Sequence, residues 1–339
     1  MPLYITYPTW IRPEIIPGLF PRWYGLMYII AFAITYLLFS WQVKKKALPV
    51  GKDTVSNFFF AGLAGLIVGA RLFATLLYAD NRDYYWSHLW MIFWPFDPST
   101  GQFTGFVGMS YHGALLGIVV GMGLYTYVKK INFLEWGDML AVAFPLGYTF
   151  GRIGNFINGE LWGRVTTVPW GILFPNATPI SVKEPWVKGV MEKTGITQII
   201  HTKMGDFVNL PRHPSQLYEA LGEGILLWLI LWFLVRPRIP FRGFAIGVYL
   251  IGYGVVRFIL EYFRTPDPGM DFPIMFDPVR DTSQIHIYLL NFTTGQILNA
   301  IEIVAGVLCL FVFSAWDKRQ KAAQLAQTEA KNPQKRRHN

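Results

Sequence analysis

Long apolar runs separated by short polar loops dominate this chain. A helix that crosses the roughly 30 Å hydrocarbon core of a membrane needs about 20 mostly apolar residues. Seven segments meet this requirement, some only when interior glycines and polar residues are accepted: approximately 23–43, 57–78, 106–128, 138–158, 216–235, 243–263 and 296–316. The first, fifth and seventh are uninterrupted, whereas the fourth and sixth carry charged residues inside the apolar run. The pattern therefore predicts an all-α polytopic membrane protein with seven transmembrane helices.

Basic residues gather in alternate loops. The loops after the first, third and fifth segments and the C-terminal tail carry Lys and Arg, whereas the loops after the second and sixth segments are mainly acidic. Because Lys and Arg in short loops stay on the cytoplasmic side, this bias predicts an outward N-terminus and a cytoplasmic C-terminus. It also accounts for most of the formal net charge of +9, so we expect no nucleic-acid partner.

The predicted helices divide the chain into five parts. They are an outer N-terminal arm (1–22), helices one to four (23–158), a head domain (159–215), helices five to seven with an outer loop at 264–295 (216–316), and a basic cytoplasmic tail (317–339). The head is rich in Pro, Gly and Thr, with β-type fragments such as residues 170–174, and we expect a small extracytoplasmic domain of short strands. The polar tail is expected to be frayed or disordered. We expect no cleaved signal peptide, because the N-terminus lacks a basic region followed by a small-residue cleavage site.

The composition excludes several classes of protein. Hydrophobic residues make up 53% of the chain and charged residues only 15%, which is incompatible with disorder. The single cysteine, Cys309, excludes an intramolecular disulfide, a Cys-rich metal site and a CxxC redox pair. The histidines lack metal-ligand spacing, and no nucleotide-binding string is present. We expect neither a metal nor a cofactor.

Ionisable residues inside the predicted spans are the first pointer to function. Such residues are costly in a membrane and commonly mark functional sites. They are Arg71, His112, Arg152, Glu219, Glu223, Arg257, Glu261 and Glu302. An alternative is structural ion pairing within the membrane, for example between Arg257 and Glu261, which are four residues apart on one helix face.

Three of these side chains are expected at the same depth. His112, Arg152 and Arg257 each lie about two helical turns, roughly 9–10 Å, from the outer end of their segment. With Glu261 and Tyr253 beside them, they predict a polar pocket that opens outward. The arginines exceed the obvious nearby acids, so we expect an anion, and a lipid phosphate suits guanidinium groups at that depth. His112 could instead be a packing residue at the start of an apolar span.

The most informative string is Gly-Arg-Ile-Gly-Asn-Phe-Ile-Asn-Gly-Glu-Leu-Trp-Gly-Arg at 151–164. A helix that only spans a membrane does not need an arginine, two asparagines and a glutamate so close together. Four further strings occur along the chain, at 22–28 (RWYGLMY), 111–113 (YHG), 213–219 (HPSQLYE) and 252–264 (GYGVVRFILEYFR). Together these strings resemble the signature of the prolipoprotein diacylglyceryl transferases, over about residues 15–316.

This resemblance implies a seven-helix enzyme of the bacterial inner membrane with a periplasmic N-terminus. Family members transfer the sn-1,2-diacylglyceryl group of phosphatidylglycerol to the lipobox cysteine of prolipoproteins, the first step of lipoprotein maturation. The products are a thioether and glycerol 1-phosphate. Arg152 and Arg257 match the family's essential arginines. Other positions tied to activity or substrate binding match Tyr24, His112, Asn155, Glu160, Gly163, Tyr253, Glu261 and Arg264. The segment 270–292 and the basic tail are longer than the family pattern.

The reaction needs a bound phosphate, a deprotonated thiol and alignment of the two substrates. We expect Arg152 and Arg257 to hold the phosphate, with Asn155 and Tyr24 as hydrogen-bond partners. His112 is the expected base. Alternatively, the arginine field lowers the thiol pKa and Glu160 or Tyr253 relays the proton.

The remaining assignments and alternatives are these. Glu261 is expected to orient Arg257, and Gly163 and Arg264 to contribute to substrate binding. Cys309 lies toward the cytoplasmic end of its span, so we do not expect a self-acylated cysteine. The main alternative is an anionic-lipid binding protein or transporter, which would need a polar path to the cytoplasmic face. A seven-helix receptor is less favoured, because the fifth loop is too short to be a long cytoplasmic coupling loop. A structural scaffold is less favoured, because it would not need buried arginines.

Overall fold

The computed structural model describes residues 4–16, 18, 21–51, 53–96, 100–103, 105, 108–265, 272–277 and 288–331. The end of the basic tail and much of the outer loop predicted at 264–295 lie outside these residues. So do parts of the N-terminal arm and most of the lengthened segment 270–292.

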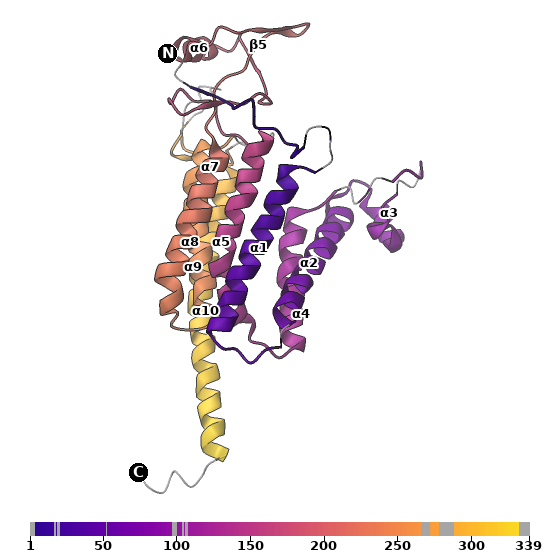
Figure 1. The fold of residues 1–339 in the computed structure, drawn as a ribbon, viewed down its shortest axis with the longest axis vertical. Coiled ribbons are helices and arrows are strands. Elements are labelled where there is room, and N and C mark those ends of the chain that lie inside the picture. Colours follow the sequence, from indigo (N-terminus) through magenta and orange to yellow (C-terminus); the bar gives the residue numbers. More distant parts are fainter. Residues whose placement is uncertain are drawn as a thin grey trace. The chain divides into compact units, whose positions relative to one another are not determined.

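Helices make up most of the described chain (Figure 1). The α-helices are α1 (Trp23–Lys45), α2 (Thr54–Phe73), α3 (Arg82–Ser87), α4 (Tyr111–Val128), α5 (Phe133–Asn158), α6 (Val187–Thr194), α7 (Ser215–Glu219), α8 (Leu227–Leu229), α9 (Phe244–Leu260) and α10 (Thr294–Lys331). The π-helical turns are η1 (Ala74–Tyr78), η3 (Ala220–Leu226) and η4 (Ile230–Val235), and the 3₁₀ turns are η2 (Leu89–Phe93), η5 (Arg236–Arg238) and η6 (Glu261–Phe263). The strands are β1 (Ile5–Thr6), β2 (Ile172–Leu173), β3 (Ile180–Ser181), β4 (Ile200–Thr202), β5 (Gly205–Val208), β6 (Ile274–Met275) and β7 (Asn291–Phe292).

Six of the predicted apolar segments coincide with helical structure, apart from single residues at their ends, and the third, 106–128, is helical from Tyr111 onward. Five continuous helices in the described chain are long and apolar enough to cross a membrane: Trp23–Lys45, Thr54–Tyr78, Ser215–Arg238, Phe244–Phe263 and Thr294–Ala323. A sixth apolar helix, His112–Val128, is shorter, and α5 carries charged residues. The prediction of a mainly helical, membrane-spanning protein is therefore confirmed.

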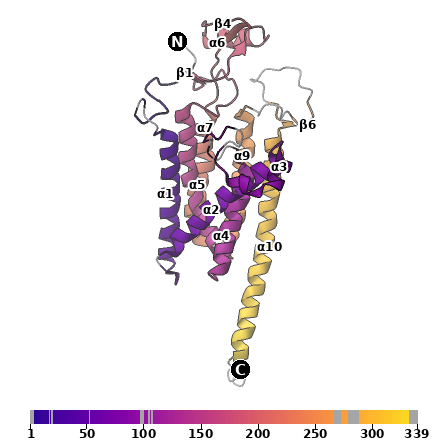
Figure 2. The same ribbon diagram turned by 90° about the vertical axis from the view of Figure 1, so that its right-hand side faces the viewer.

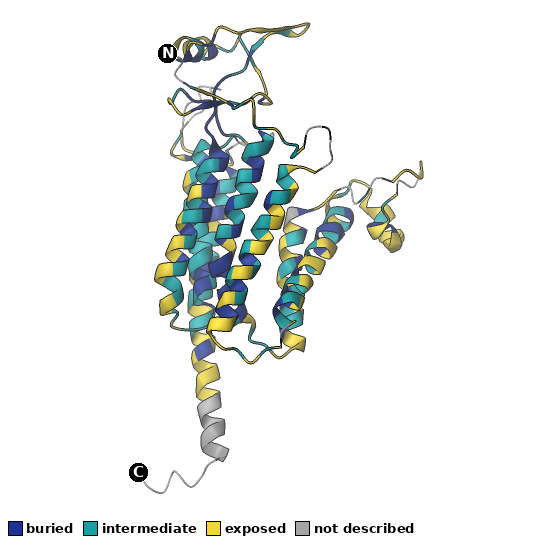
Figure 3. Ribbon diagram, viewed as in Figure 1, coloured by how far each residue is buried: buried dark blue, intermediate teal, exposed yellow. Residues whose placement is uncertain are grey.

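The chain folds as two compact units, residues 1–39 with 137–339 and residues 40–136, whose relative positions are not determined. In the first unit, α5 packs against several other helices and is buried or half-buried along most of its length (Figure 3). A methyl group at Gly147 would collide with Thr35 of α1, and one at Gly224 would collide with Thr149 of α5. These glycines let α1 and η3 approach α5 closely, as small residues do at membrane helix contacts.

Buried contacts also join α5 to the start of α9. The carboxylate of Asp138 accepts hydrogen bonds from the backbone N–H groups of Gly243 (2.7 Å) and Ile246 (3.1 Å). These are otherwise unsatisfied donors at a helix N-terminus, so Asp138 acts as a cap supplied by another helix. Beside it, an apolar cluster comprises Val142, Leu227, Leu231 and Ala245.

The connection from α5 to α7, residues 159–214, is referred to below as the head region. The antiparallel sheet β3–β5–β4 and α6 belong to it, and its apolar cluster comprises Val165, Val187, Val190, Ile196, Val208 and Leu210. Strand β2 forms within the β-type fragment 170–174 and pairs in parallel with β1 near the N-terminus. The N-terminal arm is therefore joined to the head region through this strand pair.

Helix α10 corrects the prediction for the tail. It continues to Lys331, well past the last apolar residues, and extends far beyond α9 in Figure 2. A helix of 38 residues is about 57 Å long, nearly twice the hydrocarbon thickness. The extension is rich in Ala, Gln and Lys, which are good helix formers. Because the apolar helix before it is already nucleated, adding further turns is easy, and the described tail is helical rather than frayed.

In the second unit, α2 and α4 cross in backbone contact. Methyl groups at Gly65 or Gly69 would collide with the carbonyl groups of Gly117 or Gly113, and the converse holds for Gly113 and Gly117. The Ser110 N–H donates to the Ala70 carbonyl at 3.0 Å, next to the crossing. Two helices at this separation leave no room for a side chain of any size.

Gly117→Ala is expected to destabilise the protein by about 3 kcal/mol, the upper end for overpacked cores, because the colliding group is backbone. Gly123→Ala in the same helix is the control, since its new methyl group would meet only the Phe133 ring at 3.9 Å. The control gains helix propensity and should be neutral or slightly stabilising. Thermal unfolding in detergent measures both, and equal melting temperatures would contradict the crossing.

Candidate functional site

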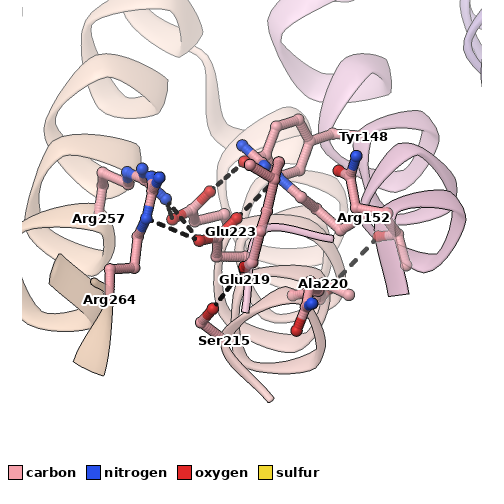
Figure 4. Close-up of polar contacts among 12 residues, drawn as sticks. Tyr148, Arg152, Ser215, Glu219, Ala220, Glu223, Arg257 and Arg264 are labelled. Atoms are coloured by element: carbon pink, nitrogen blue, oxygen red, sulfur yellow. Dashed lines mark hydrogen bonds and ion pairs between the residues drawn. The ribbon is translucent and has the colours of Figure 1, made fainter. Parts of the chain in front are cut away.

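Three helical segments of the first unit bring their charged side chains to one place (Figure 4). Arg152 and Tyr148 come from α5, while Glu219 and Glu223 come from α7 and η3. Arg257, Glu261 and Arg264 come from α9 and the turn that follows it. We call these seven residues the glutamate–arginine cluster. In Figure 4 the two glutamates of α7 and η3 lie between the arginines of the other two segments.

Glu219 is the centre of the cluster. Its Oε2 lies 2.9 Å from Nε of Arg152, and its Oε1 lies 2.8 Å from Nη1 of Arg257 and 3.6 Å from Nε of Arg264. The Glu219 side chain is 2% exposed. One buried carboxylate therefore ties together three guanidinium groups from two different parts of the sequence.

Glu223 and Tyr148 extend this network. Glu223 Oε1 lies 3.4 Å from Nη1 of Arg257, and its Oε2 accepts a short hydrogen bond from the Tyr148 hydroxyl. Tyr148 in turn accepts from Nε of Arg152 at 2.6 Å, and its ring lies 4.8 Å from the Arg152 guanidinium carbon. The π-helical turn η3 begins directly after Glu219, and such turns are frequent at functional sites.

Glu261 completes the cluster on the side of α9. It lies 3.6 Å from Arg257 and 3.9 Å from Arg264, so the ion pair expected from the four-residue spacing is present. Thr293 donates to Glu261 at 3.4 Å. A Cβ at Gly295 would lie 2.6 Å from Glu261 Oε1, so this glycine lets the start of α10 reach the carboxylate.

The charge balance of the cluster differs from the prediction. We expected the arginines to outnumber the nearby acids, but Arg152, Arg257 and Arg264 are matched by three glutamates. Only Glu261 was expected beside the arginines, because Glu219 and Glu223 belong to the fifth predicted segment and no sequence rule shows that they face α5 and α9. Buried charges persist in proteins when they are paired in this way.

A second polar group, which we call the amide–carboxylate group, lies next to the cluster. Glu160 Oε1 accepts from the amide groups of Asn155 (2.9 Å) and Asn158 (3.3 Å). The Tyr24 hydroxyl is hydrogen-bonded to Asn155 and lies 3.0 Å from the Tyr28 hydroxyl. Gln216 of α7 donates a short hydrogen bond to the Glu160 carbonyl. The amide–carboxylate group thus consists of Asn155, Asn158, Glu160 and Gln216, and Tyr24 contacts it through Asn155.

Gly163 provides a close backbone approach. Its N–H donates to the His213 carbonyl at 2.9 Å, and it forms a β-bridge with Arg264. A methyl group at this position would collide with the Phe263 carbonyl. The next residue, Arg164, donates through Nε to the Arg264 carbonyl at 2.8 Å. The contacts of Gly163 are therefore with backbone, and they hold Arg264 at the edge of the cluster.

Tyr253 and His112 occupy different surroundings. The Tyr253 ring packs against Tyr148 with a centroid distance of 6.1 Å, so Tyr253 adjoins the cluster as expected. His112 is exposed at the start of α4 in the second unit, with Nδ1 3.5 Å from the Tyr78 hydroxyl. Because the two units are not placed relative to one another, the predicted convergence of His112 with the arginines stays a prediction.

Glu219, Glu223 and Tyr148 were not predicted as members of the site, although two features of the sequence point to them. Glu219 and Glu223 interrupt an apolar segment, and they lie one helical turn apart on the same helix face. Tyr148 lies four residues before Arg152, the spacing at which side chains meet on a helix.

Within the described residues, no three His, Cys, Asp or Glu side chains are arranged to hold a metal ion.

His213, at the edge of the head region, makes the stability pH-dependent. Burial, and then the charge of Arg164, lowers the pKa of His213 to about 4 from a usual 6.5. The unfolded chain therefore binds a proton first as the pH falls, and stability is lost progressively between about pH 6.5 and 4. We expect the melting temperature to fall across this range and His213→Gln to reduce the fall. An unchanged slope in the variant would assign it to other groups.

Comparison with known proteins places this arrangement in context. A model of the family "Prolipoprotein diacylglyceryl transferase" matches residues 14–312. A phosphatidylglycerol–prolipoprotein diacylglyceryl transferase of Treponema denticola is 47% identical over 339 residues, covering 95% of this chain and 98% of the relative. Relatives with the same name from Treponema pallidum and Chlorobaculum tepidum are 46% and 37% identical, covering 94% and 92% of this chain and 97% and 92% of the relatives. The matched residues include every member of the cluster.

Proposed function

The chain belongs to the prolipoprotein diacylglyceryl transferase family and is a transferase that acts on phosphatidylglycerol and prolipoproteins; we propose that its glutamate–arginine cluster binds the lipid phosphate. The observation that carries this proposal is the convergence of Arg152, Arg257 and Arg264 on the single buried carboxylate of Glu219. Such pairing fixes the guanidinium groups in advance, which is what stabilisation of developing charge requires.

The atoms used in the ion pairs suggest how the phosphate is bound. Arg152 and Arg264 contact the carboxylates through Nε, and their terminal NH₂ groups are the fork that binds phosphate in a bidentate manner. Arg257 contacts glutamates through both Nη1 and Nη2. We therefore assign direct phosphate binding to Arg152 and Arg264, and to Arg257 both charge stabilisation and anchoring of Glu219.

The reaction transfers the sn-1,2-diacylglyceryl group to the lipobox cysteine. The thiolate sulfur attacks the glyceryl carbon that bears the phosphate, so a C–S bond forms and the C–O bond breaks. The departing oxygen keeps the bonding electron pair, and glycerol 1-phosphate leaves. The arginines stabilise the charge that develops on this leaving group, and the site aligns the sulfur with the carbon.

The thiol proton must pass to a base before or during attack. His112 is the proposed base, because a neutral imidazole accepts a thiol proton near pH 7. In the alternative, the positive charge of the arginines lowers the thiol pKa and Glu160 or Tyr253 relays the proton. The Glu160 carboxylate accepts hydrogen bonds from Asn155 and Asn158, which would hold it in a fixed position for such a relay.

His112→Gln separates these two possibilities. With His112 as the base, the turnover number should fall by about 10²-fold, a typical contribution of general base catalysis. The KM for phosphatidylglycerol should stay near its wild-type value, because the phosphate ligands are intact. Rates measured at increasing pH should recover in the variant as the thiol ionises without help. A wild-type turnover number would instead favour the relay through Glu160.

We also propose the membrane arrangement that the basic loops predict. The seven apolar segments span the bacterial inner membrane, with a periplasmic N-terminus and a cytoplasmic C-terminus. The head region then forms a small extracytoplasmic domain, and the cluster, which lies near the end of α5 that leads into it, opens to the periplasmic side. This places the cluster where exported prolipoproteins are reached.

The test of the proposed function uses the full chain reconstituted in liposomes with phosphatidylglycerol and a lipobox peptide. We expect a peptide mass increase equal to one diacylglyceryl group and an equal amount of released glycerol 1-phosphate. A peptide with Ser in place of the lipobox Cys should give neither product. Folded protein that binds the lipid without forming thioether would support the alternative of an anionic-lipid binding protein or transporter.

A further inference from the structure

Gln216 carries a buried polar atom that the protein does not satisfy. The residue is fully buried, at 0% exposure. Its Nε2 donates to the Glu160 carbonyl, whereas its Oε1 has no hydrogen-bond donor among the described residues. Exchanging the two ends of the amide would place its oxygen against the Glu160 carbonyl oxygen, so the contact fixes which end lacks a partner. A buried acceptor without a donor is costly to maintain.

Asn158, at the end of α5, repeats this arrangement. Its Nδ2 donates to the Glu160 carboxylate at 3.3 Å, and its buried Oδ1 has no donor in the described part of the chain. Two amide groups from different helices therefore bind Glu160 with their N–H ends, and both keep an unused acceptor oxygen with respect to the described residues. The chemistry of these atoms selects a hydrogen-bond donor as the ligand.

The amide oxygens lie a short distance from the proposed phosphate ligands. Gln216 and Glu219 are three residues apart in α7, and Asn158 and Arg152 are six residues apart in α5. Three residues correspond to about 4.5 Å of helical rise and six to about 9 Å. On both helices the amide side chain is on the side of the head region, so Gln216 lies about one turn and Asn158 about two turns outward from the cluster.

We propose that Gln216 and Asn158 accept hydrogen bonds from the hydroxyl groups of the headgroup glycerol of phosphatidylglycerol, and thereby determine headgroup specificity. The inference rests on the proposed function, because it takes the cluster as the phosphate site. The headgroup glycerol is attached directly to the phosphate. With the phosphate bound at the cluster, its hydroxyl groups extend outward, toward Gln216 and then Asn158. A site with unpaired acceptors disfavours an anionic lipid that has no hydroxyl donor.

The decisive experiment varies the lipid and the residue together. Thioether formation is measured in liposomes that contain either phosphatidylglycerol or phosphatidylpropanol, which has the same phosphate but no headgroup hydroxyl. The wild type should prefer phosphatidylglycerol by about tenfold in kcat/KM, the worth of one strong hydrogen bond. Gln216→Met should lose this preference, so that the ratio of the two kcat/KM values falls to about one. Asn158→Leu, at a second position, should reduce the preference.

Asn209→Leu is the matched control. Asn209 has the same arrangement, with Nδ2 donating to the Phe174 carbonyl at 2.7 Å and a buried Oδ1 for which the described residues offer no donor. It lies in the head region next to β5. This variant loses an equivalent amide and should keep the wild-type lipid preference.

Three results would overturn the proposal. A wild type that does not distinguish the two lipids would remove the headgroup contact. An equal loss on both lipids in Gln216→Met would leave the residue with only a structural role toward Glu160. A raised KM for the peptide with unchanged lipid preference would assign the acceptors to the prolipoprotein. In all three cases thioether still forms, so the proposed function stands; it fails only if no lipid yields thioether.

Discussion

Glu219→Gln is expected to reduce turnover by at least about 10²-fold, because it removes the charge that holds three arginines in place. Gln keeps the size of the side chain but carries no charge, and its NH₂ group cannot accept a hydrogen bond from the guanidinium on that side. The three arginines then repel one another in a poorly solvated site. Removing one partner of a buried ion pair typically costs about 3–5 kcal/mol, so the melting temperature in detergent should fall as well.

Glu302→Gln is the matched control for this prediction. Glu302 belongs to α10 within a membrane-spanning stretch, and it forms no ion pair with a described residue. Its substitution should leave kcat and the melting temperature near the wild-type values. Initial rates of thioether formation and thermal unfolding are measured on both proteins. Full activity in Glu219→Gln would show that the arginines hold their positions without this carboxylate.

Arg152→Lys is expected to lower kcat by about 10²–10³-fold with little loss of stability. The ammonium group keeps the positive charge beside Glu219, so the buried ion pair survives. It cannot at once contact Glu219 and Tyr148 and present a planar fork to the phosphate. The loss should therefore fall on the transition state, where the phosphate charge grows, and appear in kcat more than in KM.

Arg242→Lys provides the corresponding control. Arg242 is largely exposed, forms a long ion pair of 3.9 Å with Asp317, and is not a member of the glutamate–arginine cluster. The variant should have the wild-type kcat. If Arg152→Lys also turned over at the wild-type rate, the bidentate role of Arg152 would be lost, and Arg264 would become the main phosphate ligand.

The helices and part of the site could be predicted from local sequence. The apolar segments 23–43 and 57–78 coincide with helical structure, because length and hydropathy are properties of consecutive residues. The pair of Arg257 and Glu261 followed from helical spacing alone. The hydrogen bond between Asn155 and Glu160 was not predicted, although both residues belong to the string at 151–164.

The charge balance could not be predicted, and neither could the extent of the tail. Glu219 is 67 residues from Arg152 and 38 from Arg257 in the sequence, and only the packing of α7 and η3 between α5 and α9 brings these charges together. The tail was assigned from its polarity, whereas helix continuation depends on propensity and on the helix before it. In both cases the deciding interaction involves residues outside the local segment from which the prediction was made.

By itself, the sequence determined that this protein is a membrane-spanning helical enzyme of the prolipoprotein diacylglyceryl transferase family, and it predicted Arg152 and Arg257 as site residues. Hydropathy, spacing and motif strings carry that information because they depend on neighbours along the chain. The tertiary structure decided that Glu219 joins the three arginines, that Glu223 and Tyr148 complete the cluster, and that the buried Gln216 oxygen meets no donor among the described residues. These features depend on which helix faces pack together, and the burial that makes unpaired charge costly exists only once they have packed.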